Sequence, residues 1–99
     1  MPKFKDKVVI VTGASEGIGR SVCLRLAADG AKLSLAARNQ DRLYQLKDQV
    51  KEMGTEALVV PTDVSDPQQC KNLVDTTVMK WGGLDVLLNN AGITLWTLV

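Results

Sequence analysis

Short apolar runs alternate with longer amphipathic segments along the chain. Four runs rich in β-branched and other apolar residues predict buried strands at Lys7–Thr12, Lys32–Ala37, Ala57–Val60 and Leu84–Leu88. Between them, side chains suited to a core recur every three or four positions, which predicts three helices with one inward face each. The inward positions are Ile18, Val22 and Leu26, then Leu43, Leu46, Val50 and Met53, then Cys70, Leu73, Val74, Thr77, Val78 and Trp81.

Residues at the segment borders support these helices. Asn39 and Asp66 can cap the second and third helices, and Pro67 suits a first helical position. A glycine follows each helix, at Gly30, Gly54 and Gly82. Strands that alternate with helices pair in parallel through right-handed crossovers. A glycine-rich turn directly after the first strand makes that strand central, so we expect a three-layer, doubly wound α/β fold with sheet order 3-2-1-4. The first two helices would cover one face and the third helix the other.

Composition excludes several kinds of site. With 99 residues there is room for one domain, residues 1–99. The chain has no His, which excludes Ser-His-Asp, Cys-His and His-ligated metal sites within it. Its two cysteines, expected as reduced thiols on helix faces, are too few for a four-thiolate zinc site. Twelve Lys and Arg against eleven Asp and Glu leave a net charge of +1, which gives no support for a nucleic-acid partner.

The apolar runs are too short for a membrane. The longest strongly apolar run, Val8–Val11, falls far below the length of a spanning helix. The basic start MPKFKDK lacks the apolar stretch of a signal peptide behind it. We therefore expect no membrane partner and a cytoplasmic location.

The turn after the first strand has glycines at Gly13, Gly17 and Gly19, spaced G-x-x-x-G-x-G. Such a turn lets the backbone approach a pyrophosphate and present free N–H groups at a helix N-terminus. Ser15 and Ile18 lie in the same segment and belong to the expected contact set. A P-loop is excluded because Gly-Lys-Ser or Gly-Lys-Thr does not follow at the required spacing. A turn that serves only helix–strand packing is the alternative.

The end of the second strand carries Ala37 and Arg38, where many dinucleotide folds have a carboxylate for the adenosine ribose. A guanidinium can bind a 2′-phosphate through two parallel charge-assisted hydrogen bonds and stack on adenine. This pair therefore favours NADP(H) over NAD(H). A solvated surface arginine is the alternative.

The ends of the third and fourth strands add further candidates. Asp63 can accept a hydrogen bond from the adenine amino group, and Val64 can pack on the ring. The segment Asn90, Ala91 and Gly92 lets the backbone approach a ligand, and an Asn amide here can bind ribose or tie neighbouring strands. Structural turns are the alternative at both places. Along the carboxyl edge of a 3-2-1-4 sheet the candidates come in the order Asp63, Arg38, glycine turn and Asn90. This order matches adenine, 2′-phosphate, pyrophosphate and nicotinamide-side ribose along one dinucleotide.

TGASEGIG in the turn, DV after the third strand and NNAG after the fourth resemble the short-chain dehydrogenase/reductase family over essentially the whole chain. The resemblance implies a Rossmann-type NADP(H)-binding domain, with Arg38 similar to the NADP(H)-preferring branch. It also implies hydride transfer between the dinucleotide and a small carbonyl or alcohol substrate. The family's cofactor positions fall on Gly13, Gly17, Gly19 and Asp63, and on Asn90-Ala91-Gly92.

The family's catalytic Tyr-x-x-x-Lys does not occur in the chain. Tyr44 is followed by Lys47 at a spacing one residue too short, and on a helix remote from the nicotinamide end. We therefore predict no catalytic residue among the 99, and a cofactor-binding half that is inactive by itself. The alternative is a non-catalytic NADP(H)-binding or interaction module.

The sheet is expected to be incomplete. The third helix alone would cover one face, and the fourth strand would form a bare edge, which predicts self-association through that edge. The nonpolar tail Leu95–Val99 fits an element cut from its packing partners. Alternatively, Trp96 and Leu98 cap the open face.

Overall fold

The central feature of the fold is a sheet of order β3-β2-β1-β4-β5. The computed structural model describes residues 4–15, 17–90 and 94–97. Neighbouring strands pair in parallel among the first four, which are β1 (Val8–Thr12), β2 (Lys32–Ala37), β3 (Ala57–Pro61) and β4 (Val86–Asn89). The predicted order 3-2-1-4 is confirmed.

The prediction that the fourth strand forms a bare edge is wrong. A further strand, β5 (Thr94–Thr97), pairs antiparallel with β4, with Leu87 opposite Trp96 and Asn89 opposite Thr94. Residues of high strand propensity thus return beside β4, where their backbone groups pair with those that β4 turns away from β1. The expected self-association depended on a bare β4 edge, and in the structure β5 pairs with that edge. Leu98 and Val99 lie outside the described residues.

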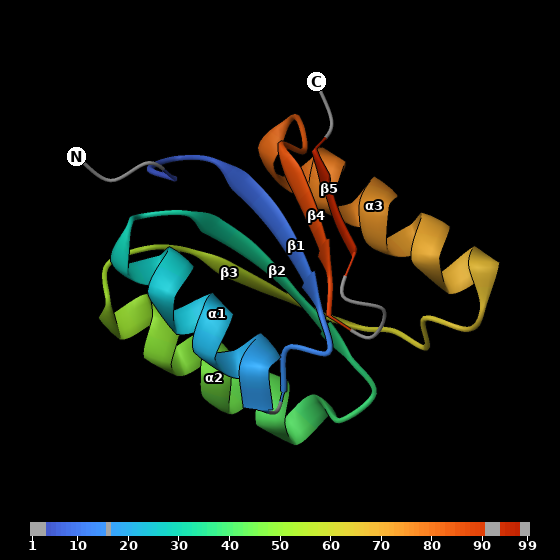
Figure 1. Cartoon of the computed structure of the whole chain (residues 1–99), viewed down its shortest axis with the longest axis horizontal. Helices are drawn as coiled ribbons and strands as arrows, with labels where there is room; N and C mark the ends of the chain where they lie inside the picture. The colour runs from blue at the N-terminus through green and yellow to red at the C-terminus, as the bar shows by residue number, and fades with distance from the viewer. Residues whose placement is uncertain (1–3, 16, 91–93, 98–99) are drawn as a thin grey trace.

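Helices cover the two faces of the sheet unequally. Figure 1 shows α1 (Gly17–Ala28) and α2 (Gln40–Glu52) on one face and α3 (Pro67–Trp81) on the other, as predicted. The caps also agree with the sequence: Asn39 accepts from the Arg42 N–H at 3.1 Å, and Asp66 accepts from the Gln68 N–H at 2.9 Å. Among the described helices, none is both long and apolar enough to span a bilayer.

The larger core cluster lies between the sheet and the α1–α2 pair. It includes Cys23, Leu35, Leu43 and Val50, none of which is measurably exposed. The predicted inward face of α1 is confirmed at Leu26, which is buried, and at Val22, which packs against the core, but Ile18 is 72% exposed and Gly19 is buried in its place. Met53 of the second predicted stripe and Val78 of the third are also exposed.

The α3 side has a smaller cluster formed by Ile10, Ala36 and Leu73. A buried hydrogen bond adds to it: the Ser34 and Thr77 hydroxyl oxygens lie 2.6 Å apart and both residues are inaccessible. Since Thr77 donates to the Leu73 carbonyl at 2.8 Å, Ser34 is the donor to Thr77. This contact fixes α3 against β2.

Candidate binding site at the carboxyl edge of the sheet

The glycine turn packs tightly against the ends of β1 and β4. A Cβ at Gly19 would lie 2.1 Å from the Gly13 carbonyl oxygen and 3.0 Å from Asn90 Nδ2. A Cβ at Gly13 would lie 3.1 Å from the same amide nitrogen, and Gly13 also has φ +62°. Packing alone therefore requires glycine at position 19, whereas at position 13 the positive φ and the close Asn90 amide together favour it.

Gly17 differs from the other two glycines. Its φ is +52°, yet a Cβ there would meet no described protein atom within 4 Å. It is the first residue of α1, whose first backbone N–H groups have no partner within the helix. The space beside Gly17 and these donors together fit a phosphate group. Ser15 and Gly17 also line an open hollow of about 630 Å³ with Arg20, Arg42, Gln45 and Gln49.

Thr12 ties the turn to β4, a role that the sequence did not predict. Its hydroxyl donates to Asn89 Oδ1 at 3.0 Å and accepts from the Asn90 N–H at 3.0 Å. Asn89 therefore joins neighbouring strands, while the Asn90 side chain lies against Gly13 and Gly19. The sequence does contain an indication of this role, because the hydroxyl of a threonine at the end of a buried central strand needs a hydrogen-bond partner. Ala91 and Gly92 lie outside the described residues.

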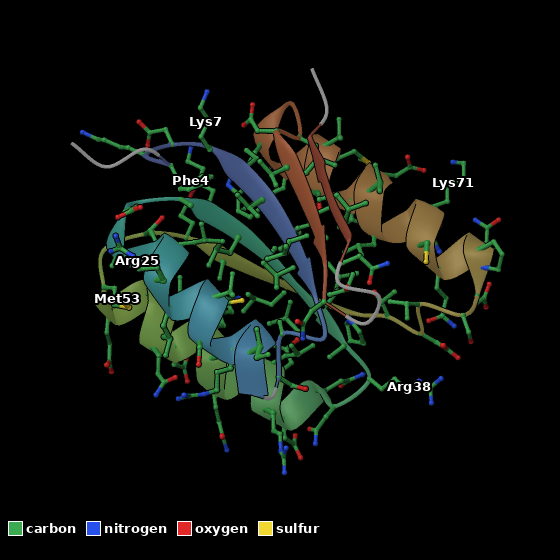
Figure 2. The ribbon with its side chains drawn as sticks, viewed as in Figure 1. Phe4, Lys7, Arg25, Arg38, Met53 and Lys71 are labelled. Atoms are coloured by element: carbon green, nitrogen blue, oxygen red, sulfur yellow. The ribbon has the colours of Figure 1, made fainter. Side chains whose placement is uncertain are left out.

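Arg38 and Asp63, which the sequence assigned to different parts of one ligand, contact each other. Arg38 Nη2 lies 2.9 Å from Asp63 Oδ1, and the Arg38 side chain remains 74% exposed. Figure 2 shows Arg38 on the loop after β2, extending away from the ribbon at the end of the sheet where β1 and β4 also end. This edge of the sheet therefore carries an exposed guanidinium that is paired with one carboxylate.

The Asp63 carboxylate is held by its own loop as well. Asp63 Oδ1 accepts from the Ser65 hydroxyl at 2.6 Å and from the Ser65 N–H at 3.0 Å. The hydrogen bond from the Ser65 hydroxyl has the largest effect on the Asp63 carboxyl, and that from Arg38 the next largest. Together they lower the pKa of Asp63 from 3.8 to about 2. Asp63 is therefore an anion at every physiological pH. Ser65 is a second site residue that the sequence did not predict.

Val64 lies at the same edge of the sheet, on the side that α3 covers. It is 41% exposed and lines a mainly apolar hollow of about 240 Å³ with Thr12, Cys70, Leu73, Val74, Leu87 and Asn89. The hollow lies where α3 meets the ends of β1 and β4. Thr12 and Asn89 therefore both tie the strands together and line this hollow.

Tyr44 and Lys47 both lie on α2, and Lys47 points toward the other edge of the sheet. Tyr44 is half exposed on α2, and Lys47 Nζ is 6.0 Å from the centre of its ring. Lys47 lines a hollow with Thr55 and Glu56 at the start of β3, which is the amino end of the parallel strands. The position of Lys47 agrees with its exclusion from a catalytic pair.

The doubly wound sheet, parallel in its first four strands, and the glycine turn at its carboxyl edge define a Rossmann-type α/β protein. Residues 7–98 match the family model described as short chain dehydrogenase. The chain belongs to this family of oxidoreductases, whose members use nicotinamide dinucleotide cofactors.

Individual relatives agree with this assignment. The chain is 44% identical over 88 residues to 11-beta-hydroxysteroid dehydrogenase-like 2 of Arabidopsis thaliana, a match that covers 88% of this chain and 29% of that protein. It is 45% identical over 89 residues to 11-beta-hydroxysteroid dehydrogenase 1A of the same plant, covering 89% and 26%. The chain thus spans less than a third of the length of these curated relatives.

A solved structure shows the same fold. L-sorbose reductase from Gluconobacter frateurii, solved in complex with NADPH and L-sorbose, superposes with a TM-score of 0.85 at 38% identity. The match covers 90% of this chain and 34% of that one.

Proposed function

We propose that residues 1–99 form the NADP(H)-binding domain of an oxidoreductase that transfers hydride between the nicotinamide and a carbonyl or alcohol substrate. The observation that carries the proposal is Arg38, a 74% exposed guanidinium at the carboxyl edge, with Ala37 where a carboxylate would repel a 2′-phosphate. The L-sorbose reductase of similar fold was solved with NADPH, which supports this choice of cofactor.

Each part of the cofactor has candidate residues on this edge. Arg38 would bind the 2′-phosphate, and Asp63 and Val64 would contact adenine. The turn Gly13–Gly19, with Ser15, Gly17 and Ile18, would hold the pyrophosphate through backbone N–H groups. Asn90, Ala91 and Gly92 would lie along the nicotinamide-side ribose. The bound nicotinamide supplies the hydride donor or acceptor; this chain's residues bind and orient it.

The substrate is proposed only as a class. The hydroxysteroid dehydrogenases and the sorbose reductase that resemble this chain are named for alcohol or carbonyl substrates. The 99 residues hold no Tyr-x-x-x-Lys, and we propose that they bind cofactor without turning over substrate by themselves. The cytoplasmic location stays a prediction.

Replacing Arg38 tests the choice of cofactor. Arg38→Ala is expected to weaken NADPH binding roughly tenfold, because charge-assisted hydrogen bonds to the 2′-phosphate are lost. NADH, which lacks that phosphate, should bind nearly as before. Dissociation constants for both cofactors, measured by isothermal titration calorimetry, check the expectation.

Arg25 provides the matched control. Its side chain is 76% exposed and paired with Asp29, on the last turn of α1. Arg25→Ala should leave both dissociation constants unchanged. Equal losses for NADPH and NADH in Arg38→Ala would show that Arg38 does not read the 2′-phosphate.

A further inference from the structure

A small hydrogen-bond network surrounds Asp63 and is not explained by adenine recognition alone. Within the described part of the chain, the side-chain bonds of Asp63 all use Oδ1, which accepts from Arg38 Nη2 and from the hydroxyl and N–H of Ser65. Asp63 Oδ2 is then the oxygen available to an amino group of a ligand. The two oxygens can therefore serve two different tasks.

The network also reaches the first turn of α3. The Asp63 N–H donates to Gln69 Oε1 at 2.7 Å, and Gln69 Nε2 lies 3.3 Å from Asp66 Oδ2. Asp66 is the N-cap of α3. The loop that carries Asp63 is thus attached to a helix that packs on the sheet, so the carboxylate has a defined position.

That position determines where Arg38 points. A long, exposed side chain loses rotamer freedom when it binds a ligand, and holding it beforehand reduces this loss. Only Nη2 of the guanidinium is engaged by Asp63, and an arginine has five N–H donors. Nitrogens suited to a phosphate therefore remain while the side chain is held.

We propose that Ser65 is a positioning residue for 2′-phosphate selectivity: it fixes the Asp63 carboxylate, which in turn holds the Arg38 guanidinium ready for the phosphate. This inference rests on the proposed NADP(H) function. Ser65 acts only through Asp63 and Arg38, so its effect on cofactor choice must disappear when Arg38 is absent.

The test is the ratio of the NADH to the NADPH dissociation constant, measured by calorimetry on the purified protein. Ser65→Ala removes one short hydrogen bond to Asp63 and is expected to lower this ratio roughly three- to tenfold. Ser65→Thr keeps the hydroxyl and should restore it. In the Arg38→Ala background, Ser65→Ala should leave the ratio unchanged.

Two further variants keep the test decisive. Asp63→Asn keeps the size of the side chain and removes its charge, and it should also lower the ratio. Ser21→Ala, a change at an exposed serine on α1, serves as the control and should change neither dissociation constant. Because Ser65 is exposed, Ser65→Ala should remain folded, and thermal melting checks this.

The outcomes separate the two proposals. If Arg38→Ala lowers the ratio but Ser65→Ala does not, the NADP(H) function stands and the role of Ser65 is refuted. A Ser65→Ala effect that is equal for both cofactors, or that persists without Arg38, also refutes it. A higher ratio in Asp63→Asn would mean that Asp63 competes with the phosphate for Arg38, and would refute the proposed positioning. If neither cofactor binds the parent protein, both proposals fail.

Discussion

Gly19 is the position in the turn that tolerates a side chain least. The atom that an added Cβ would strike is the Gly13 carbonyl oxygen, which belongs to the backbone and cannot rotate away as a side chain could. At Gly17 there is space for a Cβ, but φ +52° strains any L side chain. The two glycines are therefore required for different reasons, one by contact and one by conformation.

Alanine substitutions separate these reasons. Gly17→Ala should cost about 1–2 kcal/mol of unfolding free energy, the usual penalty of the left-handed region. Gly19→Ala should cost at least about 2–3 kcal/mol, because the turn must move to relieve the overlap. Urea unfolding of both variants measures the difference. An equal or smaller cost at Gly19 would contradict the close approach to Gly13.

Among the described elements, α3 is the helix that covers the second face of the sheet, so its attachment matters more than that of α1 or α2. Ser34 and Thr77 provide a buried polar contact within an otherwise apolar interface. Thr77 retains an acceptor, the Leu73 carbonyl, if Ser34 is removed. Ser34 has no such second bond among those described, so the two substitutions should not be equivalent.

A double-mutant cycle tests this asymmetry. Ser34→Ala should cost about 1 kcal/mol, whereas Thr77→Val should cost about 1–3 kcal/mol because it leaves the Ser34 hydroxyl buried without its partner. The double variant should cost less than the sum of both, as expected for groups in contact. Thr76→Val, at an exposed neighbour, is the control. Additive costs, measured by urea unfolding, would mean that the two hydroxyls are not coupled.

Local signals account for what the sequence predicted correctly. Asn39 and Asp66 mark helix starts because a cap acts within three residues, and the order 3-2-1-4 follows from the glycine turn. The pairing of β5 with β4 and the contact of Arg38 with Asp63 depend on segments meeting in space, which spacing along the chain does not encode. Helical spacing likewise groups Ile18 with Val22 and Leu26, but it does not encode the close approach of Gly19 to Gly13, and in the fold Gly19 is buried while Ile18 is exposed.

At the scale of the whole molecule, the larger core cluster includes Cys23. Cys23 is inaccessible in this cluster, and burial raises the pKa of its thiol from 9.0 to about 12. Cys70, on α3, is only partly buried, and its Sγ lies 3.4 Å from the Val64 carbonyl oxygen. The Cys23 thiol can therefore react only when the core opens, whereas the Cys70 thiol is partly accessible in the folded protein.

The Cys23 thiol should make the protein less stable at alkaline pH. In the folded protein it stays neutral up to about pH 12, whereas in the unfolded chain it ionises near its ordinary pKa of 9.0. Its contribution is therefore complete below pH 9 and is lost as the pH rises toward 12, at about 1.4 kcal/mol per pH unit. Urea unfolding at pH 7 to 10.5 should show a steeper decline for the parent protein and for Cys70→Ala than for Cys23→Ala. Parallel declines in all three proteins would place the Cys23 thiol in contact with water. A thiol reagent at neutral pH should likewise modify Cys70 first, and Cys23 only at the rate at which the core opens.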